Sequence, residues 1–279
     1  MLVDKPAGPT SHDVVQRVRR ALGTRAAGHT GTLDPFATGL LVVLVGRATR
    51  LARFVEAQAK AYLATAELGI ATDTDDVTGT ALGAPAEIAT VTEDHVRRAL
   101  AGFQGEQPQR PPSYSARHVA GERSYRLARR GIAVEPPETT VIVHRIDFVS
   151  YAPPELVFRV TVSAGTYVRA LARDLGARLG VGAHLTALRR EAIGELRVED
   201  AVPLDRVNAA ALQPARAALG HLPALELDEP ARVAVSHGRA LPADAGATGA
   251  VALLHGGELV AVARAEDGWL RPSVVLGTP

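Results

Sequence analysis

The chain has 279 residues, of which 47% are hydrophobic and 22% charged, a composition typical of folded globular proteins. It contains no cysteine, which excludes disulfides and thiolate metal sites. No uncharged apolar run approaches the ~18 residues that a membrane-spanning helix requires, and no stretch resembles a signal peptide. We therefore expect a cytoplasmic protein that does not associate with membranes.

The formal net charge of +1 does not by itself indicate a nucleic-acid partner, but the charge is unevenly distributed. Residues 97–130 hold eight arginines and two glutamates, whereas residues 67–94 hold seven acidic residues and no lysine or arginine. Such a basic segment can create a local positive surface on a near-neutral protein. An ordinary ion-paired surface would fit the same counts, so both interpretations stay open.

The first predicted helix follows a turn rich in proline and glycine. Thr10 or Ser11 can cap its N-terminus, apolar residues recur at helical spacing from Val14 to Leu22, and Gly23 can end it. This spacing predicts a helix that packs one face on a hydrophobic core.

The most distinctive stretch is residues 28–41, GHTGTLDPFATGLL, in which Asp34 is the only acid. Its glycines permit turns and close approach to a ligand, and Pro35 disfavours a helical conformation at Asp34. The apolar run from Leu40 to Val45 predicts a buried strand or the start of a buried helix. The stretch therefore presents one carboxylate on a shaped loop, although an aspartate that bonds its own turn backbone would fit the same pattern.

The acidic turn at residues 72–79 resembles a calcium-binding loop in composition. Its residues, however, do not match the positions that such a loop requires. A calcium loop of the EF-hand type that began at Asp73 would need an oxygen ligand at Val77, glycine at Thr78 and glutamate at Ala84. None of the three is present. We therefore predict no metal site in this turn.

Alternation and helical spacing predict the remaining elements. Residues 209–228 suggest a helix followed by a linker. In order, the others are strands at 60–70, 141–151 and 156–163, helices at 92–100 and 167–180, a basic helical piece within 108–131, a strand at 231–235, and a hairpin of 251–254 with 259–263 that turns at 255–257.

Five motifs in this order resemble the tRNA pseudouridine-55 synthase (TruB-type) family, over roughly residues 1–200. The resemblance implies an α+β fold around a mixed, largely antiparallel sheet with flanking helices and an active-site cleft across it. The motifs are Leu2-Val3-Asp4-Lys5-Pro6-Ala7-Gly8-Pro9-Thr10-Ser11, residues 28–50, Lys60-Ala61-Tyr62, Thr72-Asp73-Thr74-Asp75 with Gly79, and Gly165-Thr166-Tyr167-Val168-Arg169.

The resemblance assigns the catalytic residues. Isomerising uridine to pseudouridine breaks the N1–C1′ bond and joins C5 to C1′, so it needs a carboxylate beside the sugar and no cofactor or metal. Asp34 is that carboxylate, and Arg169 is the partner whose charge opposes the rise in pKa that burial causes. Tyr62 matches a tyrosine that stacks on the uracil and can take the C5 proton.

The resemblance also assigns residues that bind the substrate, a nucleotide flipped out of the T stem-loop of tRNA. His29 matches a histidine that inserts into the RNA loop, Leu188 an apolar residue that closes the pocket, and the arginines of residues 110–130 and 169–190 suit phosphates. The full set expected to bind substrate is His29, Lys5, Gly31, Thr32, Leu188, Tyr167, Arg126, Arg129 and Arg130.

The resemblance divides the chain into a catalytic domain at residues 1–222, with an RNA-clasping insertion at about 80–131, and a small β-rich PUA-like domain at 223–279. It implies a monomer that requires no protein partner. His118 stands where the family's insertion usually has a lysine.

Two other functions remain open on the sequence alone. A non-catalytic RNA-binding or tRNA-folding module of the same fold would have no need of Asp34. A metal-dependent phosphohydrolase built on Asp73, Asp75 and Asp76 would lose its activity in the presence of a chelator.

Overall fold

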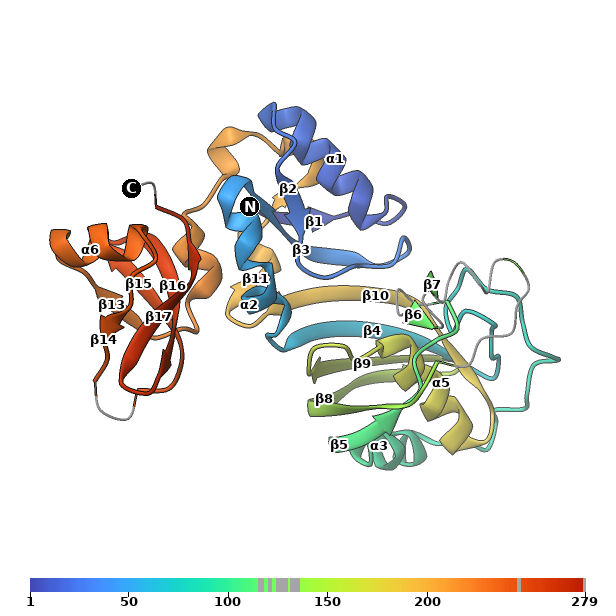
Figure 1. Ribbon diagram of the computed structural model, residues 1–279. Coiled ribbons are helices and arrows are strands. Elements are labelled where there is room, and N and C mark those ends of the chain that lie inside the picture. Colours follow the sequence, from blue (N-terminus) through green and yellow to red (C-terminus); the bar gives the residue numbers. More distant parts are fainter. Residues whose placement is uncertain (115–117, 120–121, 124–129, 131–135, 245–246, 278–279) are drawn as a thin grey trace.

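The computed structural model spans residues 1–279 and describes all of them except 115–117, 120–121, 124–129, 131–135, 245–246 and 278–279. At 118–119 and 122–123 it describes the backbone alone. A sheet of ten strands forms the larger body, and a sheet of five strands lies in the C-terminal part (Figure 1). A two-stranded pair joins β6 (His118–Val119) to β7 (Glu122–Arg123).

The larger sheet is mixed and largely antiparallel, which confirms the expected fold class. In this sheet only the β1–β12 and β3–β10 pairs run parallel among the described strands. Its main path is β12 (Val202–Pro203), β1 (Leu2–Lys5), β3 (Thr38–Val45), β10 (Ala183–Ile193), β4 (Lys60–Leu68), β9 (Glu155–Val162), β8 (Thr139–Ala152) and β5 (Gly105–Gln109), with β2 (Ala27–His29) paired to β3 and β11 (Leu196–Arg197) to β10.

Burial explains why the strands differ in the pattern of their apolar residues. β3 is buried at six of its eight positions, so the apolar run after Gly39 is a strand covered on both faces. β4 alternates strictly between buried and half-buried positions, as the period-2 pattern predicts for a strand with one covered face. Both strands pair with β10, which therefore lies at the centre of the sheet.

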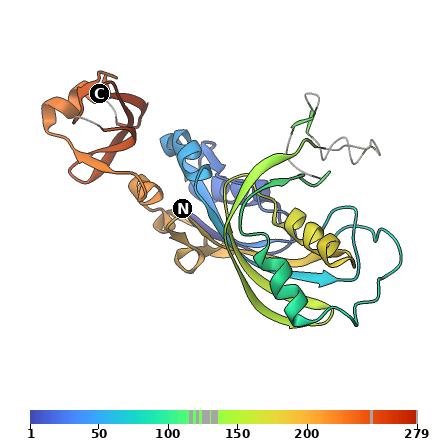
Figure 2. The same ribbon diagram turned by 90° about the horizontal axis from the view of Figure 1, so that it is seen from below.

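α3 (Glu93–Ala101) and α5 (Val168–Leu179) lie next to each other on one face of the curved sheet (Figure 2). Val96 and Leu100 of α3 and Leu171 and Leu175 of α5 share a core with Phe158 of β9. Each such side chain, when fully buried, stabilises the fold by about 1.5–3 kcal/mol. This packing fixes the N-terminus of α5 against the sheet.

α1 (Ser11–Leu22) begins and ends as the sequence predicts. Thr10 and Asp13 form a reciprocal capping box, and Gly23 ends the helix at a φ of 61°. Val14 and Val18 are buried in a second core with neighbours on β1 and β3. α1 therefore supports the strand that follows the Asp34 loop.

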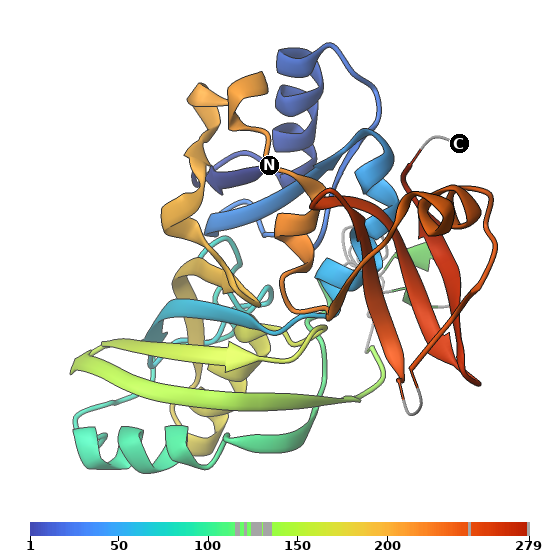
Figure 3. The ribbon, with the colours of Figure 1, turned by 90° about the vertical axis from the view of Figure 1, so that its left-hand side faces the viewer.

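The C-terminal sheet has the order β13 (Ala224–Glu226), β15 (Gly249–His255), β16 (Glu258–Glu266), β17 (Trp269–Val275) and β14 (Leu241–Pro242). β15 and β16 form the predicted hairpin. Gly256 and Gly257 turn it with φ values of 58° and 78°, the sign that a type I′ turn requires. Figure 3 shows this sheet beside the short helices η1 (Gly46–Leu51) and α2 (Ala52–Glu56) of the larger body.

Hydrogen bonds and apolar contacts join the C-terminal sheet to the larger body. Arg47 and Arg50 donate hydrogen bonds to the backbone carbonyls of Leu276 and Val275, at 2.9 and 2.7 Å. Leu259 and other residues of the C-terminal sheet share a core with residues of β3 and α2. The C-terminal sheet is thus packed against η1 and α2, the short helices that follow β3.

Two predictions about the C-terminal third were wrong. The predicted strand at residues 231–235 is α6 (Glu229–Ser236), because Asp228 caps Ala231 at 2.9 Å, Pro230 fits the first helical turn, and only Val235 is buried. The predicted helix within 209–228 is replaced by the short 3-10 turns η4 (Ala209–Ala211) and η5 (Ala215–Leu219). Pro214 lies between these turns and has no N–H to continue a helix.

Two elements of the described structure lie within the expected insertion at about 80–131. α3 packs in the main core, and β5 pairs with β8 at the edge of the larger sheet. Both elements are therefore part of the larger body. The predicted basic helical piece with Tyr125, Leu127 and Ala128 lies outside the described residues.

Candidate active site

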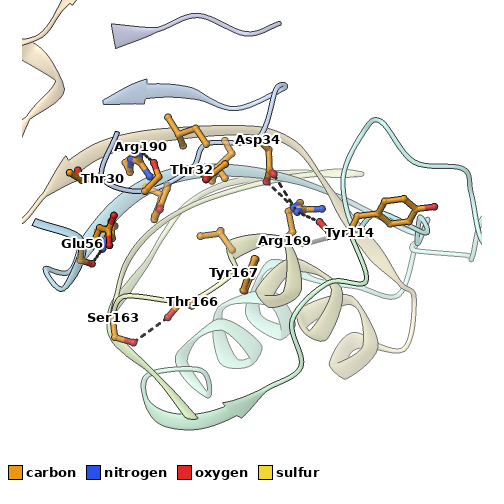
Figure 4. A pocket seen from close by; sticks show the side chains of 17 residues that line it. Thr30, Thr32, Asp34, Glu56, Tyr114, Ser163, Thr166, Tyr167, Arg169 and Arg190 are labelled. Atoms are coloured by element: carbon orange, nitrogen blue, oxygen red, sulfur yellow. Dashed lines mark hydrogen bonds and ion pairs between the residues drawn. The ribbon is translucent and has the colours of Figure 1, made fainter. Parts of the chain in front are cut away.

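A cavity of about 320 Å³ opens between the Asp34 loop, the β4–β10 part of the sheet and the N-terminus of α5. Figure 4 shows Asp34 and Arg169 pointing toward each other within it. Seven of the expected site residues line this cavity, namely Gly31, Thr32, Asp34, Tyr62, Tyr167, Arg169 and Leu188.

Asp34 lies on an irregular loop between β2 and β3, as expected for a residue before proline. Its side chain is 34% exposed, and the flanking Leu33 and Ala37 are buried in the core. The loop thus anchors its apolar side chains inward and presents the carboxylate to the cavity.

Arg169 lies in the first turn of α5 and is only 5% exposed. Its Nε lies 2.9 Å from Oδ2 of Asp34, and its Nη2 donates to Oδ1 at 3.3 Å. Nη1 lies 3.1 Å from Oδ2 of Asp76, which is also 5% exposed. The guanidinium donates as well to the carbonyls of Thr74 at 2.6 Å and Tyr114 at 2.9 Å.

Asp76 is held by its own turn. Its Oδ1 accepts hydrogen bonds from the Thr74 hydroxyl at 2.8 Å and from the Thr78 N–H and hydroxyl at 2.9 and 2.5 Å. Its Oδ2 is left for Arg169. The acidic turn therefore orients the arginine that contacts Asp34, and Asp76 is a residue that the sequence analysis considered only for a metal site.

Burial raises the pKa of the Asp34 carboxyl above its ordinary value, and the Arg169 guanidinium opposes that rise. The negative charge of Asp76 adds to the rise, while Lys5 opposes it. Asp34 is thus a carboxylate whose charged form depends on Arg169.

Tyr62 and Leu188 form an apolar wall of the cavity, and each is 8% exposed. They come from the neighbouring strands β4 and β10. Among the described residues, the Tyr62 hydroxyl has no hydrogen-bond partner, so it is available to a bound molecule. A flat ring, an apolar side chain and a carboxylate–guanidinium pair thus meet in one cavity.

The structure does not bring Lys5 into this cavity. Lys5 is fully buried, and its Nζ donates to the carbonyls of Pro6 at 2.8 Å, Pro35 at 3.3 Å and Ala37 at 2.7 Å. Burial lowers its pKa to about 8. Its contacts support the Asp34 loop from behind, and the expectation that it binds substrate stays a prediction.

Models of two protein domains match consecutive parts of the chain. The N-terminal domain of TruB family pseudouridylate synthase matches residues 19–168, and the tRNA pseudouridylate synthase B C-terminal domain matches residues 169–223. The chain belongs to the TruB family of pseudouridylate synthases. It is therefore a pseudouridine synthase, and the non-catalytic interpretation is not supported.

Curated relatives of this synthase match along its whole length. It is 44% identical to the tRNA pseudouridine synthase B of Gloeobacter violaceus, covering 99% of this chain and 98% of that protein. It is 42% identical to the tRNA pseudouridine synthase B of Aromatoleum aromaticum, covering 100% and 92%.

Two similar solved structures belong to H/ACA RNA–protein particles. The Nop10–Cbf5 complex of the archaeal box H/ACA sRNP matches with a TM-score of 0.74 and 28% identity, over 99% of this chain and 85% of that chain. An H/ACA RNP bound to a substrate RNA containing 2′-deoxyuridine matches with the same TM-score and identity, over 99% and 83%.

His29 of this synthase lies at the end of β2, outside the cavity lining, and is half-buried. Its Nδ1 is buried without a partner among the described residues. Burial, and then the charge of Arg190, lower its pKa, which favours the neutral ring. Arg126 and Arg129 lie outside the described residues, and Arg130 is exposed.

The acidic turn does not assemble a metal site in the described part of this synthase. Within it, no group of three or more histidine, aspartate or glutamate residues lies close enough to hold a metal ion. Asp75 instead pairs with Arg173 at 3.0 Å, and Asp73 accepts the Thr80 N–H at 2.7 Å. No helix in the described residues is long and apolar enough to cross a membrane.

On the sequence, Arg190 was considered only among the arginines that suit RNA phosphates. This residue follows Leu188 by two positions on β10, is 1% exposed, and lines the cavity. It forms a double arginine with Arg189, and the sequence gives no sign of which of the two faces inward. The register between β10 and β4 decides which arginine faces the cavity, because Arg190 lies opposite Tyr62 on β4.

Proposed function

We propose that this protein converts uridine to pseudouridine at position 55 in the T loop of tRNA. The observation that carries the proposal is the Asp34 carboxylate, which is paired with a buried arginine in a cavity beside a tyrosine. The names of the curated relatives, tRNA pseudouridine synthase B, support tRNA as the substrate.

Asp34 acts in this proposal at the glycosidic bond of the target uridine. A carboxylate can add to C1′, remove a proton from the sugar or attack the base. All three routes need the ionised form, and Arg169 favours that form inside a cavity that burial would otherwise make unfavourable. The paired arginine is therefore part of the catalytic unit.

Tyr62 and Leu188 hold the detached uracil while it turns. The tyrosine ring offers a flat surface on which the base can stack, and its hydroxyl can take the C5 proton. Leu188, on the neighbouring strand, forms the apolar wall of the cavity together with Tyr62. Both residues line the same cavity as Asp34, which supports their assignment.

The target nucleotide must leave the RNA stack to reach this cavity, at a cost of about a few kcal/mol for unstacking. In the proposal His29 fills the gap that the nucleotide leaves. Its position at the end of β2, outside the cavity, and its lowered pKa suit a neutral ring that enters an RNA loop.

We propose that residues 1–222 form the catalytic domain, with an RNA-clasping insertion at about 80–131, and that residues 223–279 form a PUA-like domain. The enzyme acts in the cytoplasm as a monomer and requires no protein partner. The similar Cbf5 chain was solved in a complex with Nop10, so we test the monomeric state separately. Light scattering of the purified enzyme, with and without tRNA, measures the stoichiometry directly.

The experiment that tests the function uses the purified protein alone with an unmodified tRNA transcript. Mapping pseudouridine by chemical modification and primer extension should show one site, at position 55. A transcript with cytidine at position 55 is the matched control and should stay unmodified. Pseudouridine at another position, or none without an added protein, would overturn the proposal.

A further inference from the structure

The loop that carries Asp34 is held from behind by three buried polar side chains. The Ser11 hydroxyl donates to the Leu33 carbonyl at 3.0 Å and accepts the Leu33 N–H at 2.8 Å. Lys5 donates to the carbonyls of Pro35 and Ala37. Buried backbone carbonyls need partners, and this irregular loop has few from its own backbone.

Arg190 is the third support and binds both ends of the loop. Its Nε donates to the Leu40 carbonyl at 2.7 Å, and its Nη2 donates to the Gly31 carbonyl at 3.1 Å. Gly31 and Leu40 lie nine residues apart in sequence and flank Asp34. The rigid planar fork of one guanidinium thus connects the start and the end of the segment.

Arg190 is unusual in its charge environment. It is 1% exposed, and among the described residues no carboxylate contacts its guanidinium. Buried arginines are ordinarily paired with an acid, since a charge removed from water must be compensated. Here backbone carbonyls serve as the observed partners, so the side chain is committed to the shape of the loop.

The backbone of Arg190 meets the same loop. Arg190 pairs with Gly39 in the parallel β3–β10 ladder. A Cβ at Gly39, where φ is 100°, would lie 2.3 Å from the Arg190 carbonyl oxygen, so the two backbones are in close contact. Strand and side chain together fix where the loop leaves the sheet.

We infer that Arg190 is a positioning residue for the isomerisation, because its guanidinium joins Gly31 to Leu40 and so sets the place of Asp34 against Arg169. The inference rests on the proposed catalytic role of Asp34. It is distinct from substrate contact, although Arg190 lines the cavity. An arginine that bound an RNA phosphate would act on affinity, whereas a positioning residue acts on turnover.

The test compares Arg190→Met, Arg190→Lys and the matched control Arg189→Met. A lysine keeps the charge but cannot reach both carbonyls in the arginine's forked geometry. Arg189 precedes Arg190 on the same strand, pairs with Asp4 at 2.8 Å and is 39% exposed. It carries the same charge on the opposite side of the strand.

We expect Arg190→Met to lower single-turnover rates at saturating tRNA about 100-fold, since a misplacement of about 1 Å can cost that much. The dissociation constant for tRNA should stay within about threefold, and Arg190→Lys should recover only part of the rate. Arg189→Met should keep the rate within about threefold. Rates are expressed per folded molecule, from circular dichroism and melting curves.

Several outcomes would overturn the inference. A loss confined to the dissociation constant would make Arg190 an RNA contact, and an equal loss in Arg189→Met would make the effect a general one of the strand. A normal rate in Arg190→Met would remove the role. If Arg190→Met does not fold, Arg190→Lys decides by the same readouts. Full turnover in Asp34→Asn would instead overturn the proposed function.

Discussion

Arg169 contacts Asp34 with its Nε at 2.9 Å, although the two residues lie 135 positions apart in the chain. The same guanidinium contacts Asp76 at 3.1 Å. One buried cation thus lies between two carboxylates, of which only Asp34 faces the cavity. In the proposed function, Asp34 is the carboxylate that reacts and Asp76 the one that orients its partner.

Asp34→Asn should abolish pseudouridine formation and leave the dissociation constant for tRNA within about tenfold, or about 1.4 kcal/mol. The amide has the same shape but lacks the negative charge that the reaction needs at the sugar. Filter binding and pseudouridine mapping on the same preparation measure both quantities. Asp73→Asn, in the nearby turn, is the control and should retain its activity.

Arg169→Ala should cut turnover severely and lower the free energy of unfolding by about 3 kcal/mol or more, because it leaves the buried Asp76 without its cation. Arg178→Ala is the control in the last turn of the same helix. Arg178 stacks 4.1 Å from the centre of the Phe103 ring, away from the cavity. Normal turnover per folded molecule in Arg169→Ala would contradict the pairing.

The pH dependence of turnover should depend on Asp76. The raised pKa of Asp34 means that acidification protonates it at a higher pH than a free aspartate, so turnover is present above that pKa and lost as the pH falls through it. Asp76→Asn removes a charge that raises the pKa of Asp34. The acidic limb should therefore move to lower pH. Single-turnover rates between pH 4 and pH 8 measure it, and a shift to higher pH would show that another group controls the limb.

Exchanging Arg126, Arg129 and Arg130 for alanine should weaken tRNA binding and flatten its dependence on salt. For each RNA phosphate that is no longer neutralised, the slope of log K against log salt should fall by about 0.7–0.9. Arg145→Ala on β8 is a control for removal of one surface charge, since Arg145 is 73% exposed and paired with Asp147. An unchanged slope in the triple variant would remove this segment from the RNA interface.

Much of the fold could be predicted because its signals are local. The capping box at Thr10, the alternation of β4 and the double glycine of the β15–β16 hairpin each depend on residues within a few positions of one another. α6 was mistaken for a strand because the five residues Ala-Arg-Val-Ala-Val are too few to distinguish the helical period from the strand period. Its cap at Asp228 was the local signal that could have corrected the prediction.

The sequence by itself determined that one carboxylate, Asp34, is displayed on a loop shaped by glycine and proline, and through its motifs it indicated the family. Only the tertiary structure decided what holds that carboxylate and its arginine in place. Asp76 contacts Arg169 from a turn, and Arg190 contacts the loop through a strand register that brings distant segments together. Such contacts depend on side-chain direction and burial in three dimensions, which residue spacing along one chain does not specify.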